Sequence, residues 1–138
     1  SKKMSKSELS DLSRINLTDE KDQIVNKIKK AKTDPMPMPS TVDELEKRLE
    51  AKNLIGIFSS LSDLTLEKTV NEFSGKNFSL FKESLAQVLI DKIIPISVEI
   101  KRLLNEKDYL DKILTDGCNK ANDISSKKIK KIHEILGF

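Results

Sequence analysis

Apolar residues recur at helical spacing along most of the chain, and short polar or proline-rich segments separate these runs. The first run predicts a helix over about residues 19–32, with Thr18 or Asp19 as its N-cap. Its apolar positions are Ile24, Val25, Ile28 and Ala31. The sequence Pro-Met-Pro-Met-Pro at 35–39 cannot be helical, because proline lacks an amide hydrogen and restricts the residue before it. We therefore expect an extended linker there.

Five further helices are expected beyond this linker, and no pair of strands. They cover about residues 41–48, 53–62, 65–73, 79–104 and 107–136. Thr41 and Thr65 are the expected N-caps of two of them. Pro95 predicts a kink or break near residues 91–95, and Gly117 an interruption of the last helix. The pattern predicts an all-α fold, a helical bundle preceded by an irregular N-terminal loop.

Composition excludes several classes of site. Hydrophobic residues make up 37% of the chain and charged residues 34%, and no apolar run approaches the roughly 20 residues that span a membrane. With Cys118 as the only cysteine and His133 as the only histidine, we expect no disulfide and no metal site of the usual four-ligand kind. Cys118 is expected to be buried, because it shares an apolar helix face with Ala121 and Ile124. A single cysteine also fits a cytoplasmic location.

Basic residues are concentrated in two of the predicted helices. Residues 21–32 and residues 120–131 each contain five lysines and one acid, although the net charge of the chain is only +3. Such helices are typical either of a surface that faces phosphates or of ordinary solvated faces. The candidate nucleic-acid contacts are Lys27, Lys29, Lys30, Lys127, Lys130 and Lys131.

A short motif near the N-terminus carries the clearest chemistry. Residues 3–7 read Lys-Met-Ser-Lys-Ser, so two lysines flank a small hydroxyl residue. Ammonium groups are compact charges that can follow phosphate oxygens as negative charge moves in a transition state. A loop of this kind can close over a nucleotide after it binds. Five residues alone are weakly specific, because lysine- and serine-rich tails are common.

The sequence after this motif resembles the C-terminal region of bacterial and organellar tryptophanyl-tRNA synthetases almost from end to end. The order and spacing of the matching stretches carry the resemblance. These stretches are residues 15–19, 27–34, 53–62, 75–86, 95–96, 117–121 and 136–137. One departure is that residues 8–11 lack the Asp-Pro or Asn that many relatives place after the motif.

That resemblance implies a class I aminoacyl-tRNA synthetase cut just before its ATP loop. Residues 1–18 would hold this loop and the end of a catalytic domain, and residues 19–138 a helical domain that receives the anticodon end of the tRNA. Lys3 and Lys6 would be catalytic, and the ATP-binding residues would be Lys3, Met4, Ser5, Lys6 and Ser7. The parent enzyme would use ATP with Mg²⁺, tryptophan and tRNA(Trp), and would dimerise through the catalytic domain. The fragment alone is expected to be an inactive monomer with no membrane partner.

Two alternatives remain open at the level of sequence. The chain can be a free-standing helical module that binds nucleic acid, without an enzymatic parent. It can also be a helical protein-interaction domain whose basic stripes are merely solvated. Salt-dependent binding of tRNA separates these two alternatives, because each neutralised phosphate releases counterions.

Overall fold

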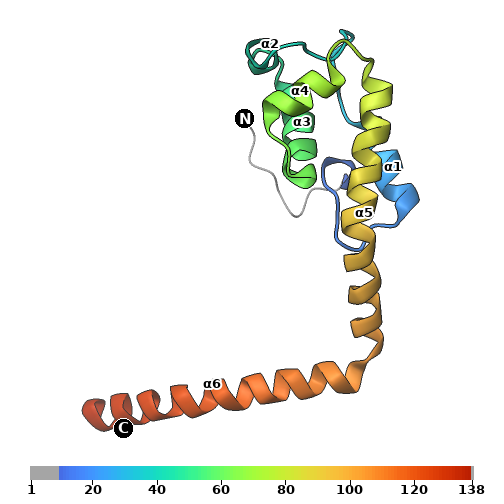
Figure 1. Ribbon diagram of the computed structural model, residues 1–138. Coiled ribbons are helices and arrows are strands. Elements are labelled where there is room, and N and C mark those ends of the chain that lie inside the picture. Colours follow the sequence, from blue (N-terminus) through green and yellow to red (C-terminus); the bar gives the residue numbers. More distant parts are fainter. Residues whose placement is uncertain (1–9, 138) are drawn as a thin grey trace. The chain divides into compact units, whose positions relative to one another are not determined.

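The computed structural model describes residues 10–137, which form helices and connecting turns (Figure 1). A 3₁₀ turn, Asp11–Ser13, comes first. The helices that follow are α1 (Lys21–Lys30), α2 (Val42–Glu46), α3 (Leu49–Ser62), α4 (Leu66–Phe73), α5 (Phe78–Asn105) and α6 (Lys107–Leu136). The described residues contain no strand, so the prediction of an all-α fold is confirmed. Within the same residues, no helix combines the length and apolar character needed to cross a membrane.

Side-chain caps fix where several helices begin. Thr41 Oγ1 accepts a hydrogen bond from the Glu44 amide at 3.2 Å, and a Glu44 carboxylate oxygen accepts one from the Ser40 amide at 2.9 Å. Thr65 caps α4 in the same way, through the Lys68 amide at 3.3 Å. Each bond satisfies an amide that the first helical turn leaves without a partner. Both threonine caps were expected from the sequence.

The N-terminus of α1 differs from the expectation. Glu20, rather than Thr18 or Asp19, is the N-cap, and it forms a reciprocal pair with Gln23, whose Oε1 accepts from the Glu20 amide at 2.8 Å. Asp19 has another role, because its carboxylate accepts the Asn16 amide at 2.9 Å and is buried. The helix therefore begins about two residues later than expected.

Three phenylalanines join α3, α4 and α5 into one core. Phe58 and Phe73 have ring centroids 5.0 Å apart, Phe73 and Phe81 4.9 Å, and Phe58 and Phe81 5.8 Å. The first two pairs meet edge-on, which is a preferred geometry of aromatic pairs, and the third pair is tilted. The fully buried residues around them include Ile24 of α1 and Leu45 of α2. Helices α1 to α4 and the first half of α5 therefore contribute to a single hydrophobic core.

The proline-rich linker is held by backbone and side-chain hydrogen bonds. The Met38 amide donates to the Lys76 carbonyl at 2.8 Å, and the Gly75 amide donates to the Met38 carbonyl at 3.2 Å. Arg48 donates to both carboxylate oxygens of Asp34, at 2.9 and 2.5 Å, and to the Pro37 carbonyl at 2.7 Å. The linker contains no helix, as predicted, and Met38 is buried in the core.

Neither Pro95 nor Gly117 breaks its helix, and a kink at Pro95 stays a prediction. α5 continues through Pro95, which costs one backbone hydrogen bond. Ile93 and Ile94 pack against the core and Ser97 is buried, so tertiary packing holds the helix on both sides of the proline. α6 likewise continues through Gly117, because one helical glycine costs only about 1 kcal/mol relative to alanine.

The chain divides into two compact units, Ser1–Val98 and Glu99–Phe138. The first contains the core described above. The second contains α6, none of whose side chains is buried. The expectation that Cys118 is buried is therefore wrong, because its apolar stripe has no packing partner within α6 itself. The expected domain boundary between residues 18 and 19 stays a prediction.

Candidate functional site

The lysine–serine motif lies outside the described residues. Lys3, Met4, Ser5, Lys6 and Ser7 all precede residue 10, where the description of the chain begins. The first described feature after the motif is the Asp11–Ser13 turn, which Ser10 caps by accepting the Leu12 amide at 3.4 Å. What can be built from the structure is therefore the segment that follows the motif, together with the basic helices.

A partly buried ion cluster fastens this segment to α1. The Lys27 ammonium donates to an Asp11 carboxylate oxygen at 2.5 Å and to an Asp19 carboxylate oxygen at 2.6 Å. The Asn16 amide group adds bonds to Asp11 at 3.0 and 3.1 Å and to Asp19 at 3.3 Å. Arg14 Nε pairs with Asp11 at 2.9 Å. We call Asp11, Arg14, Asn16, Asp19 and Lys27 the Lys27 cluster.

The charges of the Lys27 cluster balance and shift one another's ionisation. Two carboxylates face two cations, so the cluster has no formal net charge. The hydrogen bond from Lys27, followed by that from Asn16, holds the pKa of Asp11 below its ordinary value. Burial lowers the pKa of Lys27, but the hydrogen bonds from its ammonium to Asp11 and Asp19 outweigh burial, and the net pKa is raised. Lys27 is therefore a permanently charged link between the post-motif segment and α1.

Lys27 was predicted to lie on a basic surface, and the structure corrects that prediction. Its side chain is only 6% exposed, and Asp19 is only 4% exposed. A lysine held by two carboxylates in this way is not displayed to a phosphate. The sequence carried a signal for its burial, since Lys27 follows Ile24 by three residues and so lies on the apolar face of α1.

Lys29 and Lys30 are exposed in the last turn of α1, as predicted. The C-terminal carbonyls of that turn are held by Lys82 of α5, whose ammonium donates to the Ala31 carbonyl at 2.6 Å and to the Lys29 carbonyl at 3.2 Å. A cation at this end of a helix also complements the helix dipole. Burial lowers the pKa of Lys82. Lys82 could not be recognised as a site residue from the sequence, because its partners are backbone atoms about 50 residues away.

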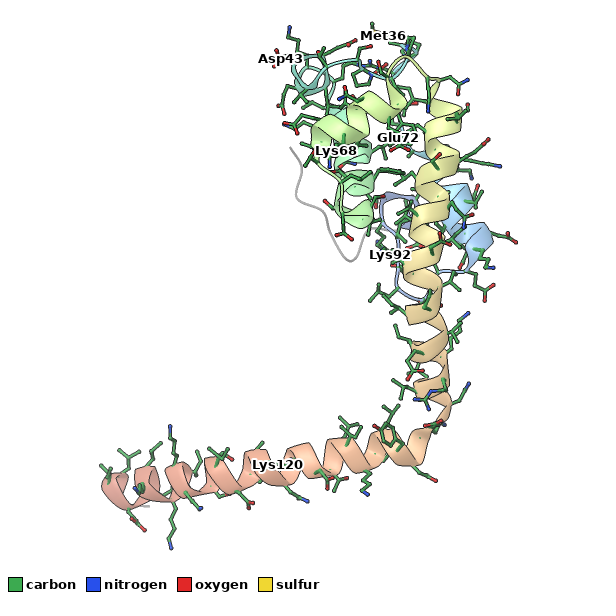
Figure 2. The ribbon with its side chains drawn as sticks, in the orientation of Figure 1. Met36, Asp43, Lys68, Glu72, Lys92 and Lys120 are labelled. Carbon is green, nitrogen blue, oxygen red and sulfur yellow. The ribbon has the colours of Figure 1, made fainter. Side chains whose placement is uncertain are left out.

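Lys127, Lys130 and Lys131 are exposed on α6, in the second unit. Their spacing of three and four residues brings their side chains to one face of the helix. The side chains of α6 project from it all along its length, Lys120 among them (Figure 2). The structure thus brings Lys29 and Lys30 together in one unit, and the three α6 lysines together in the other.

A metal-dependent site has no support among the residues that the structure describes. Residues 10–137 contain no group of three or more His, Cys, Asp or Glu side chains that could hold a metal ion. His133 is exposed near the end of α6, where its carbonyl accepts the Gly137 amide at 2.9 Å. The described chemistry is that of lysine ammonium groups and their carboxylate partners.

Comparison with known proteins gives one consistent set of relatives. The family model of the class I tRNA synthetases (W and Y) matches residues 1–94. A tryptophan--tRNA ligase of Mesorhizobium japonicum is 46% identical over 138 residues, which is 100% of this chain and 39% of the relative. The ligase of Agrobacterium fabrum is 47% identical over 99% of the chain, and that of Caulobacter vibrioides 42% identical over 100% of it. The chain spans about two fifths of the length of these relatives.

Proposed function

The chain belongs to the class I tRNA synthetase family of the tryptophan and tyrosine enzymes, and we propose that it is the part of a tryptophan--tRNA ligase that supplies the ATP loop and a tRNA-binding helical domain. The observation that carries the proposal is similarity along the whole chain to ligases for tryptophan, at 42–47% identity in the relatives named above. Family membership argues against both a free-standing nucleic-acid module and a protein-interaction domain.

In this proposal residues 1–18 act on ATP and residues 19–138 act on tRNA(Trp). Lys3, Met4, Ser5, Lys6 and Ser7 contact ATP, which arrives with its Mg²⁺, and Lys3 and Lys6 stabilise its phosphates. During amino-acid activation, negative charge moves onto the departing pyrophosphate. A lysine that meets this charge more closely in the transition state than in the bound substrate raises the rate of the step.

The Lys27 cluster supports the proposed division into an ATP-binding segment and a tRNA-binding domain. It fastens Asp11, four residues after the motif, to a helix of the tRNA-binding part. A loop that must close over ATP needs an anchored end about which it can move. The cluster supplies a fixed end on the side of the helical domain.

The test is the substitution Lys6→Ala in a full-length tryptophan--tRNA ligase that carries this sequence. We expect the single-turnover rate of adenylate formation to fall by about 10²–10³, since one preorganised contact to a developing charge has this effect. Tryptophan affinity should change little. Lys30→Ala is the matched control and should leave the rate unchanged. An unaltered rate in Lys6→Ala would remove this lysine from the mechanism. The 138-residue chain alone should show only background pyrophosphate exchange.

A further inference from the structure

A cavity of about 560 Å³ lies between α1 and the N-terminal half of α5, two helices that run close together in Figure 1. Its volume falls within the range of about 300–1,000 Å³ that is typical of small-ligand pockets. Val25 of α1 and Ala86 and Ile90 of α5 form its apolar walls. Apolar walls of this kind can cover the faces of a nucleobase, while polar groups at the rim meet its edge.

Two lysines give the cavity a positive character. Lys29 lines it from the exposed side of α1, and Lys82 lines it from α5. Because Lys82 donates to carbonyls of residues 29 and 31, its ammonium is fixed in place and also fixes this end of α1. Lys29 has no such restraint in the bonds described and can reach a phosphate at the rim. The neighbouring Lys30, of identical charge, is not part of the lining.

Hydrogen-bond acceptors lie on the α5 side of the cavity. Glu83 and Gln87 are exposed, line the cavity and are four residues apart, so they occupy one face of α5. The Gln87 side-chain nitrogen donates to Asp91 at 2.8 Å, which leaves its carbonyl oxygen to accept a bond from a ligand. A carboxylate accepts bonds but cannot donate them. Acceptors select an exocyclic amino group, such as that of cytosine, over the O4 carbonyl of uracil.

We propose that this cavity binds one unpaired base of an RNA, prefers a base with an exocyclic amino group, and places the adjoining phosphate on Lys29. The base must be unpaired, because within a duplex its edge and faces are occupied by pairing and stacking. The inference rests on the proposed function, in which the partner of the chain is a tRNA. It adds the place where one base is read and the groups that read it.

The experiment is a set of anisotropy titrations of the 138-residue chain with labelled oligocytidylate, oligouridylate and an RNA duplex of equal length. We expect the cytidine oligomer to bind about 5-fold or more tightly than the uridine oligomer, since a base-edge contact of this kind discriminates by at least about that factor. The duplex should bind more weakly than the cytidine oligomer. Equal affinity of the wild-type chain for the cytidine and uridine oligomers overturns the proposal.

Variants locate the preference in the cavity. Glu83→Ala combined with Gln87→Ala should make the two oligomers bind equally, because the acceptors are gone. Glu72→Ala, on α4 (Figure 2), also removes one negative charge and should strengthen both complexes without changing their ratio. Lys29→Gln should weaken the cytidine complex more than Lys30→Gln does. A preference that survives the Glu83–Gln87 double variant overturns the proposal, and both altered residues are exposed enough that folding is preserved.

The proposed function fails on different measurements. If the chain binds tRNA(Trp) in a salt-dependent way but does not discriminate the oligomers, only the cavity assignment fails. If Lys6→Ala leaves adenylate formation unchanged while the cytidine preference holds, the ligase assignment fails and the cavity assignment stands.

Discussion

Lys27 is a nearly buried cation that joins two carboxylates of the first unit. Its ammonium is the shared partner of Asp11 and Asp19, and the Asp19 carboxylate is almost completely removed from solvent. Removing the cation would leave a buried carboxylate without its counter-charge, which typically costs about 3–5 kcal/mol. The post-motif segment and α1 should therefore loosen together when Lys27 is changed.

Lys27→Met keeps the length of the side chain and removes its charge. We expect the free energy of unfolding to fall by about 3 kcal/mol or more, measured by urea denaturation followed by circular dichroism. Lys30→Met, at an exposed position of the same helix, should change it by no more than about 0.5 kcal/mol. Equal effects of the two substitutions would show that the Lys27 cluster contributes little to stability.

The carboxylates of Asp11 and Asp34 should make the free energy of unfolding depend on pH. The hydrogen bonds from Lys27 and Arg48 hold the pKa values of Asp11 and Asp34, respectively, below their ordinary value of 3.8. A carboxylate with a depressed folded-state pKa stabilises the fold above its unfolded-state pKa. This contribution is lost as the pH falls through the folded-state pKa. The urea midpoint should therefore drop as the pH is lowered below about 4.

The double variant Asp11→Asn, Asp34→Asn tests this dependence. It should be less stable than wild type at pH 7 and converge with it at low pH, because both lose the same ion pairs there. The double variant Asp111→Asn, Asp116→Asn, at two exposed carboxylates of α6, is the charge-matched control. Parallel curves for the double variant and wild type over the whole range would rule out Asp11 and Asp34 as the source.

At the scale of the elements, local signals in the sequence predicted which segments are helical. They did not predict where all of these helices begin. The caps at Thr41 and Thr65 were predicted because the side chains bond amides three residues away. α3 begins at Leu49 instead of about residue 53, since Glu50, Ala51 and Lys52 are good helix formers that the apolar pattern does not register. Pro95 predicted a kink or a break, and packing of its neighbours keeps the helix unbroken.

The candidate site was less predictable than the helices for a physical reason. Lys29, Lys30 and the α6 lysines were recognised from charge alone and are exposed. Lys27 and Lys82 act through partners that are distant in sequence, 8 to 53 residues away, and only the folded chain brings these together. Whether a charged side chain is buried depends on such partners. The helical spacing of apolar residues in the sequence does not reveal them.

Two glycines in neighbouring elements should respond oppositely to the same substitution. Gly56 lies inside α3, and a Cβ added there meets nothing within 4 Å, so Gly56→Ala should stabilise the chain by about 0.5–1 kcal/mol. Gly75 also has room for a Cβ, but its φ is +68°, so Gly75→Ala should cost about 1–2 kcal/mol from the backbone alone. The urea midpoint of each variant measures its change in stability. Shifts of the same sign would contradict the opposite effects predicted for the two glycines.

At the scale of the whole molecule, the candidate RNA contacts are divided between two units. Lys29 and Lys30 belong to the first, and Lys127, Lys130 and Lys131 to the second. The net charge of +3 is modest, so the proposed binding of RNA would depend on these local concentrations of lysine. If both units contact one tRNA, each lysine that neutralises a phosphate contributes separately to the salt dependence of binding.

The salt dependence of tRNA(Trp) binding is the most direct test of whether lysines of both units contact the RNA. Affinities of the wild-type chain, of Lys29→Gln with Lys30→Gln, and of Lys127→Gln with Lys130→Gln and Lys131→Gln would be measured from low to moderate salt. Each lysine removed should reduce the log–log slope by roughly 0.7–0.9. Lys68→Gln, on α4 (Figure 2), is the control and should leave the slope unchanged. Reduced slopes in both multiple variants are the predicted result. Identical slopes in all the proteins would mean that these lysines are only solvated, and would contradict the account.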